Sequence, residues 1–192
     1  FFIIDEPFYN NGFYRQHQQL FDIGKAFSEG IEMMVQKKLA KNIYGLASLS
    51  WFRSRYQDYG GIWRERIFDQ RLIASIEGGF KPSDKWEFSL HWIYSGGRPY
   101  TPFDEAKSLE ANTGVLNSNL VNQARNPHFN YLNLRVDRRW HFSRTNLVLY
   151  LSVYNALNRQ NVSAYYWNSA KQQVDTIYQW GALPIFGIEY EF

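Results

Sequence analysis

Residues 85–95 (KWEFSLHWIYS) carry the feature that most limits the fold, a regular alternation of large apolar and polar side chains. One parity of the segment is apolar and holds Trp86, Phe88, Leu90, Trp92 and Tyr94. The other parity holds Glu87, Ser89, His91 and Ser95, with Ile93 as its exception. Because successive side chains of a β-strand point to opposite faces, this segment is predicted to be a strand with one apolar and one polar face.

Similar segments recur along the chain and predict an all-β fold. Residues 131–142 and 147–154 alternate as clearly as 85–95, and residues 70–80 alternate more weakly. The last segment, 182–192, puts Phe186, Ile188, Tyr190 and Phe192 on one face and Ile185, Gly187, Glu189 and Glu191 on the other. The predicted strands, about seven in number, are 28–37, 43–56, 70–80, 85–97, 129–142, 146–157 and 182–192.

The connections between these strands alternate in length, which predicts an antiparallel, up-and-down sheet. Short polar turns are expected at 38–42, 81–84 and 143–145. The longer connections are 57–67, 97–128 and 158–181, and the last is predicted to hold a hairpin of Val162–Trp167 with Val174–Trp180. Short turns on one side of a sheet and long loops on the other are typical of outer-membrane β-barrels.

Composition favours such a barrel over a soluble sandwich or barrel, which would also show alternation. Aromatic residues make up 19% of the chain and gather near the predicted strand ends, yet the mean hydropathy is negative. No apolar run approaches the roughly 18 residues of a spanning helix. The expected strands, about 10–13 residues long, match the length needed to cross a bilayer at a tilt. Arg138 falls on the apolar face, where Trp140 and Phe142 mark an interfacial position.

Charged side chains on the polar faces are predicted to form a structural network inside the barrel. Its members are Arg71, Glu77, Glu87, His91, Arg135, Asp137 and Arg139. Aromatic residues in the last long loop have two readings, ligand binding by stacking or an outer aromatic girdle. These residues are Tyr165, Tyr166, Trp167, Tyr178 and Trp180.

Several short motifs carry a family resemblance. The alternating aromatic end, Phe186, Ile188, Tyr190 and Phe192, resembles the C-terminal signal that the barrel assembly machinery reads in outer-membrane proteins. The segments GGRPYTP (96–102), RNPHFNYLNLRVD (125–137), VYNALN (153–158) and QWGALPIFGI (179–188) resemble, in order and spacing, the last strands of TonB-dependent outer-membrane receptors. Tyr131 and Asn133 depart from the arginine and aspartate usual in the second segment.

The resemblance covers roughly residues 24–192 and implies a barrel of about 22 strands with an N-terminal plug inside it. It also implies uptake of a scarce nutrient, powered through TonB, and it admits a surface lipoprotein as a partner. Residues 1–192 are therefore expected to be the C-terminal portion of one barrel domain in the bacterial outer membrane, in contact with lipid. The plug and the earlier strands are expected to lie outside this sequence, which starts without Met and shows no signal peptide.

A second interpretation stays open because single-chain bacterial barrels have an even number of strands. If residues Phe1–Tyr9 form one more strand, the chain is a complete eight-stranded barrel with a structural or adhesive role. In the first interpretation, the first 25 or so residues end another long loop.

Catalytic and cofactor chemistry is not expected. The chain has no cysteine, and its four histidines (His17, His91, His128 and His141) are scattered. No metal-binding, phosphate-binding or nucleophile motif occurs. Ser89 and His91 share one face and are the only pair that a third interpretation, an outer-membrane enzyme, could use. The net charge of +3, with both signs mixed along the chain, argues against binding nucleic acid.

Overall fold

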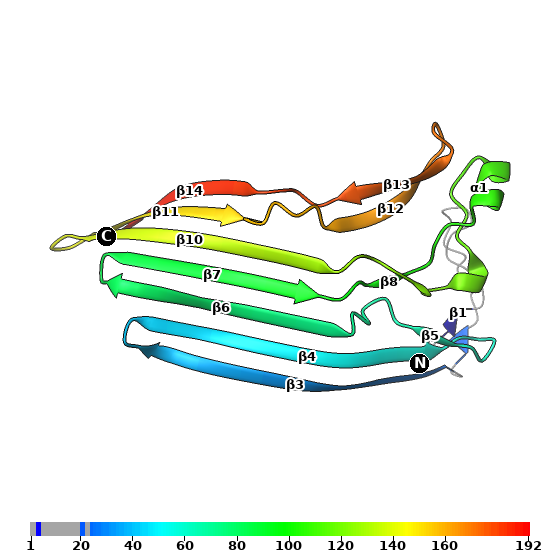
Figure 1. The fold of residues 1–192 in the computed structure, drawn as a ribbon, viewed down its shortest axis with the longest axis horizontal. Helices are drawn as coiled ribbons and strands as arrows, with labels where there is room; N and C mark the ends of the chain where they lie inside the picture. The colour runs from blue at the N-terminus through cyan, green and yellow to red at the C-terminus, as the bar shows by residue number, and fades with distance from the viewer. Residues whose placement is uncertain (1–2, 5–19, 22–23) are drawn as a thin grey trace.

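The structure, a computed structural model, describes residues 3–4, 20–21 and 24–192. Its main element is one antiparallel sheet with the order β3-β4-β6-β7-β10-β11-β14, which confirms the predicted all-β, antiparallel fold. Figure 1 shows these strands side by side in a gently curved layer. They are β3 (Lys25–Ala40), β4 (Ile43–Gln57), β6 (Leu72–Ser83), β7 (Trp86–Ser95), β10 (Phe129–His141), β11 (Asn146–Tyr154) and β14 (Leu183–Glu191).

The smaller elements gather at the end of the sheet opposite its short turns (Figure 1). They are β1 (Ile3–Ile4) paired with β2 (Leu20–Phe21), β5 (Trp63–Glu65) beside β4, β8 (Pro99–Tyr100) paired with β9 (Ala124–Arg125), the hairpin β12 (Val162–Asn168) with β13 (Gln173–Tyr178), the helix α1 (Glu105–Ala111) and a 3-10 turn (Ser118–Leu120). Within this loop end, sequence patterning anticipated only the β12–β13 hairpin.

The sequence did not predict the helix α1, because the helix is short and buries only one small residue, Ser108. Asp104 caps it by accepting a hydrogen bond from the backbone N–H of Lys107 at 3.2 Å, and Asn112 ends it in the left-handed conformation. Ser108 is the residue of the helix that is buried. A seven-residue helix of this kind gives no amphipathic period in the sequence.

One face of the sheet, called here the apolar face, consists of large side chains left open. The paired positions include Leu90 with Leu134, Phe88 with Phe80, and Leu149 with Ile188. The exposed members of this face are Phe27, Ile31, Met33, Val35, Ile43, Leu49, Trp51, Ile76, Phe80, Trp86, Phe88, Leu90, Leu134, Leu149, Leu151, Phe186, Ile188 and Tyr190. No helix in the described part of the chain is long and apolar enough to cross a membrane.

The opposite face, called here the polar face, holds most of the buried polar side chains of the sheet. Serines link neighbouring strands across it, Ser28 with Ser54 at 2.6 Å and Ser48 with Ser75 at 2.9 Å. Further buried polar residues of this face are Glu87, Ser95, Asp137 and Ser152. The buried side chains of the sheet are therefore mostly polar, with Val148 as an apolar exception, whereas a water-soluble sheet buries its apolar face.

The sheet is open in the part of the chain that the structure describes. There, β3 pairs only with β4 on the main sheet and β14 pairs only with β11, so each outer strand has an unpaired edge. The strand considered for residues Phe1–Tyr9 lies outside the described residues except for Ile3–Ile4, which belong to β1.

Candidate functional site

Glu87 is the centre of a charged network on the polar face. The residue is 9% exposed, and its carboxylate accepts a hydrogen bond from the Tyr44 hydroxyl at 2.5 Å and one from Arg139 Nη2 at 2.8 Å. Lys81 Nζ lies 3.2 Å from the same carboxylate. These partners come from β4, β10 and β6, so one side chain of β7 joins four strands of the sheet.

Asp137 lies directly opposite Glu87 in the β7–β10 register and is only 3% exposed. Arg135, on the same strand and face, donates to Asp137 from Nε at 3.0 Å and from Nη2 at 2.5 Å. The guanidinium of Arg135 also lies 4.0 Å from the centre of the Tyr150 ring and 3.6 Å from Glu189. Two opposed carboxylates repel each other, and the cations around this pair compensate the repulsion.

Two tyrosines of the network lie over glycines on the neighbouring strands. Gly79 faces Tyr44 and Gly187 faces Tyr150 in the strand register. A Cβ atom added at Gly79 would be 2.4 Å from the Tyr44 hydroxyl, and one at Gly187 would be 2.4 Å from Tyr150 Cζ. The glycines therefore leave space for the rings that carry the network.

Glu77 and His91, which the sequence placed in the same network, oppose each other on β6 and β7. Both line a hollow of about 780 Å³ on the polar face, together with Lys37, Ser89 and Arg135. Neither side chain has a hydrogen bond or an ion pair among the described residues. Ser89 and His91, the pair considered for catalysis, are likewise not hydrogen-bonded to each other there.

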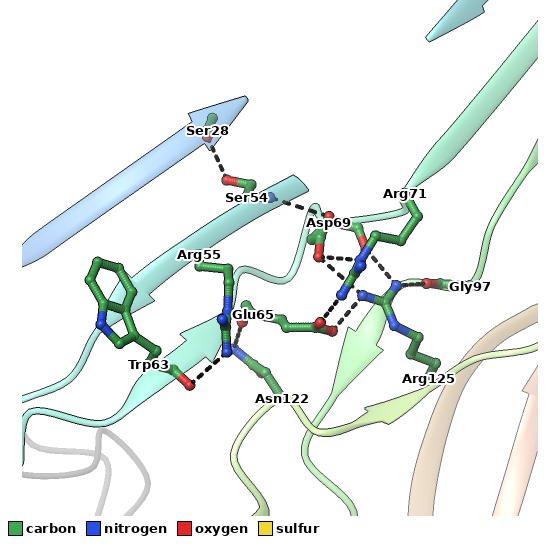
Figure 2. Close-up of polar contacts among 10 residues, drawn as sticks. All are labelled: Ser28, Ser54, Arg55, Trp63, Glu65, Asp69, Arg71, Gly97, Asn122 and Arg125. Carbon is green, nitrogen blue, oxygen red and sulfur yellow. Dashed lines mark hydrogen bonds and ion pairs between the residues drawn. The ribbon is translucent and has the colours of Figure 1, made fainter. Parts of the chain in front are cut away.

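Arg71 belongs to a different cluster, at the loop end of the sheet (Figure 2). It precedes β6 with a positive φ of 67° and donates from Nε to Asp69 at 2.9 Å and from Nη2 to Glu65. Asp69 is fully buried and also accepts the backbone N–H of Ser54 at 3.3 Å. The prediction that Arg71 shares the network of Glu87 is not met, because the chain turns at Arg71 before the strand begins.

Arg125 is the second cation of this loop-base cluster, which we define as Glu65, Asp69, Arg71, Asn122 and Arg125. Its guanidinium donates to both carboxylates and to the backbone oxygens of Asp69, at 2.6 Å, and of Gly97, at 2.9 Å. Asn122 Nδ2 donates to the Glu65 carbonyl at 2.8 Å. Figure 2 shows how these contacts join the bases of two long loops.

Electrostatics fixes the charge state of this cluster. Burial opposes ionisation of Glu65, but hydrogen bonds and charge from Arg71 and Arg125 outweigh it and lower its pKa below the ordinary 4.5. Burial also opposes the charge of Arg71, and Glu65 and Asp69 outweigh it and raise the pKa of that guanidinium. Glu65 and Arg71 are therefore both ionised at neutral pH.

The aromatic candidates of the last loop divide into two sets. Tyr165 and Trp167 contact the preceding long loop, with the ring of Tyr165 4.7 Å from Tyr100 and that of Trp167 6.5 Å from Phe103. The others are open to solvent, namely Tyr166 at 41%, Tyr178 at 49% and Trp180 at 79% exposure. The second set is the one available to a ligand.

Of the C-terminal residues interpreted as an assembly signal, Phe186, Ile188 and Tyr190 share one face of β14, and Phe192 follows the last residue of the strand. Phe186, Ile188, Tyr190 and Phe192 are 58–99% exposed. The outer edge of β14 has no partner strand among the described residues. An aromatic strand with an unpaired edge is suited to recognition by strand addition.

Sequence patterning missed most of the loop-base cluster. Glu65, Asp69 and Asn122 lie in irregular segments, where no periodicity marks which charges meet. Arg125 stands in one of the family-like motifs, and that motif was the available signal. The described residues hold no group of three or more His, Cys, Asp or Glu side chains able to bind a metal ion.

Comparison with known proteins gives no assignment: no family model matches the chain, and no curated protein matches it significantly.

Proposed function

We propose that this chain is the C-terminal part of a TonB-dependent receptor, a β-barrel that takes up a scarce nutrient across the bacterial outer membrane. The observation that carries the proposal is the two-faced sheet, with large apolar side chains exposed over much of one face and the carboxylates of Glu87 and Asp137 buried on the other. An apolar surface of this extent aggregates in water and is stable against lipid.

A soluble sandwich would cover the apolar face with a second layer. All extensive contacts between the described elements are instead between paired neighbouring strands. The strands also have the length that a bilayer requires, from nine residues in β11 and β14 to 16 in β3. Both observations favour lipid as the solvent of the apolar face.

Closure of the barrel requires partners for the unpaired edges of β3 and β14, because an open edge is not stable in lipid. Further strands therefore complete the barrel, about 22 in all by family resemblance. The network around Glu87 then lines the interior, where it contacts the plug.

The receptor assignment within the class of barrels rests on the family-like motifs, and the spatial relation of two of them supports it. In the structure, GGRPYTP (96–102) and the start of RNPHFNYLNLRVD (125–137) lie side by side. Pro99 pairs with Arg125, and Asn126 N donates to the Arg98 carbonyl at 3.0 Å. The two motifs, which are separated by 23 positions from Pro102 to Arg125, thus form one structural unit.

The test is the intact mass of the protein isolated from outer membranes, with gel migration before and after heating in detergent. We expect a mass several-fold above 22.8 kDa and a heat-dependent shift. A mass near 22.8 kDa with the same shift would replace the receptor by a small complete barrel, and absence from the membrane fraction would overturn the proposal. Uptake is tested by deleting the gene, which should slow growth only when metal chelates, vitamins or glycans are scarce.

A further inference from the structure

We propose that Arg138, held between Trp86 and Trp140 on the apolar face, binds the phosphate of a glycerophospholipid headgroup in the membrane leaflet at the short-turn end of the sheet. This inference rests on the proposed membrane function and adds a ligand that the function does not require. On a lipid-facing surface, the positive charge of Arg138 carries a free-energy cost unless it finds an anionic partner.

The side chain of Arg138 lies against two aromatic rings. Its guanidinium carbon lies 4.7 Å from the centre of the Trp86 ring and 5.3 Å from that of Trp140. Contact with an aromatic ring satisfies the charge through the ring's electrons and does not use the N–H donors. Among the described residues, the Arg138 side chain forms no hydrogen bond and no ion pair.

The neighbouring carboxylates are all directed elsewhere. Glu87 and Asp137 lie on the opposite face of the sheet and are bound by other cations. Glu191 is also on that face and accepts a hydrogen bond from Asn146 at 3.1 Å. Asp84 lies in the turn between β6 and β7. Arg138 therefore presents several N–H donors and a full positive charge without an anionic partner from the described chain.

The position along the strand brings these donors to the headgroup level. Arg138 is three residues from the end of β10, about 10 Å along the strand at the usual rise. The long side chain can cover part of that distance toward the interface. Trp86 stacks on Phe88 at 6.0 Å and Tyr190 lies 6.3 Å from Phe192, so aromatic rings mark the same zone.

A phosphate diester is the anion that this zone of a bilayer supplies. Guanidinium groups bind phosphate through paired N–H donors, with greater strength than neutral hydrogen bonds. The flanking indoles limit the motion of Arg138, so little side-chain entropy is lost on binding. A headgroup that lacks phosphate offers none of these contacts.

The experiment is native mass spectrometry of the full protein, purified in detergent and titrated with phosphatidylglycerol or with a phosphate-free glycolipid of the same acyl chains. We expect the wild type to retain phosphatidylglycerol preferentially and Arg138→Gln to reduce that affinity about tenfold. Arg138→Lys should retain part of the preference. Arg144→Gln, in the exposed turn after β10, is the matched control and should leave it unchanged.

The inference would be overturned by equal retention of both lipids by the wild type, by unchanged retention in Arg138→Gln, or by an equal loss in Arg144→Gln. Displacement of phosphatidylglycerol by inorganic phosphate would show a free-anion site and would also overturn it. The comparison of two lipids on the wild type needs no variant. A protein with a heat-dependent shift but no lipid preference contradicts this inference alone, whereas absence of the shift contradicts the proposed function.

Discussion

Asn155 is almost completely buried, and both ends of its side-chain amide are used. Nδ2 donates to the carbonyls of Arg159 and Trp180, each at 2.9 Å, and Oδ1 accepts the Arg159 N–H at 3.2 Å. Its φ of 50° is a left-handed conformation that asparagine tolerates better than most residues. Asn155 thus ties the end of β11 to the segment that leads back into β14.

Replacing Asn155 by alanine should destabilise the protein by about 2–3 kcal/mol, because buried carbonyls lose their donors and alanine must adopt a left-handed backbone. Urea unfolding of the protein in detergent measures this loss. Asn119→Ala, an exposed asparagine of the preceding loop, should stay within about 0.5 kcal/mol of the wild type. Equal effects of the two substitutions would contradict the role given to Asn155.

The packing of the Tyr44 ring over Gly79 can be tested by substitution. In Gly79→Ala the new Cβ meets the Tyr44 ring, which must move away from Glu87, at a cost of about 1–3 kcal/mol. In a Tyr44→Ala background the same change should cost much less, since the clash is gone. A double-mutant cycle on unfolding free energies measures the coupling; additive effects would disprove the contact.

At the scale of elements, the loop-base cluster predicts how the long loops respond to acid. The pKa of Glu65 is lowered in the folded protein, so its stabilising effect is complete above the ordinary value of 4.5 and is lost as pH falls through the lower, folded value. Arg71 and Arg125 form ion pairs with Glu65, Asp69 shares both of these cations, and Arg55 lies opposite Glu65 in the strand register. Limited proteolysis between pH 6 and 3 should show the loops opening only in the acidic part of this range.

Glu65→Gln should make these loops sensitive to protease already at pH 6 and remove most of the pH dependence. Glu105→Gln, on the exposed first turn of α1, is the matched control and should cleave like the wild type at each pH. If the loops of the wild type were cleaved equally at pH 6 and at pH 3, the ionised carboxylate of Glu65 would not be what holds the loops closed.

The strand β14 gives the second prediction at this scale. Removing the terminal ring in Phe192→Ala should leave most of the protein unassembled, because strand addition depends on alternate side chains as well as on the backbone edge. The heat-shifted fraction in outer membranes measures assembly. Phe142→Ala, an equally apolar change in a turn with 58% exposure, should assemble normally. Normal assembly of Phe192→Ala would contradict the signal interpretation.

The elements also show what the sequence could predict. Each predicted strand overlaps an observed one. The two-residue alternation depends only on the residues of the strand itself, so it can be recognised without knowing the neighbouring strands. The members Glu87, Arg139, Arg135 and Asp137 of the polar network lie together, because their parity and strand order were both readable. The position of Arg71 and the partners Glu65 and Asp69 depended on loop paths, which no period encodes.

At the scale of the whole molecule, the two faces of the sheet must differ in their tolerance of charge. Leu90 and His91 are neighbours near the middle of β7 and belong to opposite faces. If lipid covers the apolar face, Leu90→Lys should cost about 2–4 kcal/mol. His91→Lys places the cation opposite Glu77 on the polar face and should cost far less. Unfolding from lipid vesicles compares the two, and equal costs would argue against a membrane-facing surface.

The pinning of the loops at their bases also has an evolutionary consequence. Beyond the loop-base cluster, the segment 104–121 contacts the tip of the β12–β13 hairpin, where Ser169 and Gln172 donate to Asn112 at 3.2 Å each. Residues beyond a fixed base can change without disturbing the sheet below them. If these loops lie at the cell surface, as the proposed function requires, sequence variation between relatives should therefore accumulate together at 104–121 and 168–173, while Gly97, Asn122 and Arg125 stay unchanged.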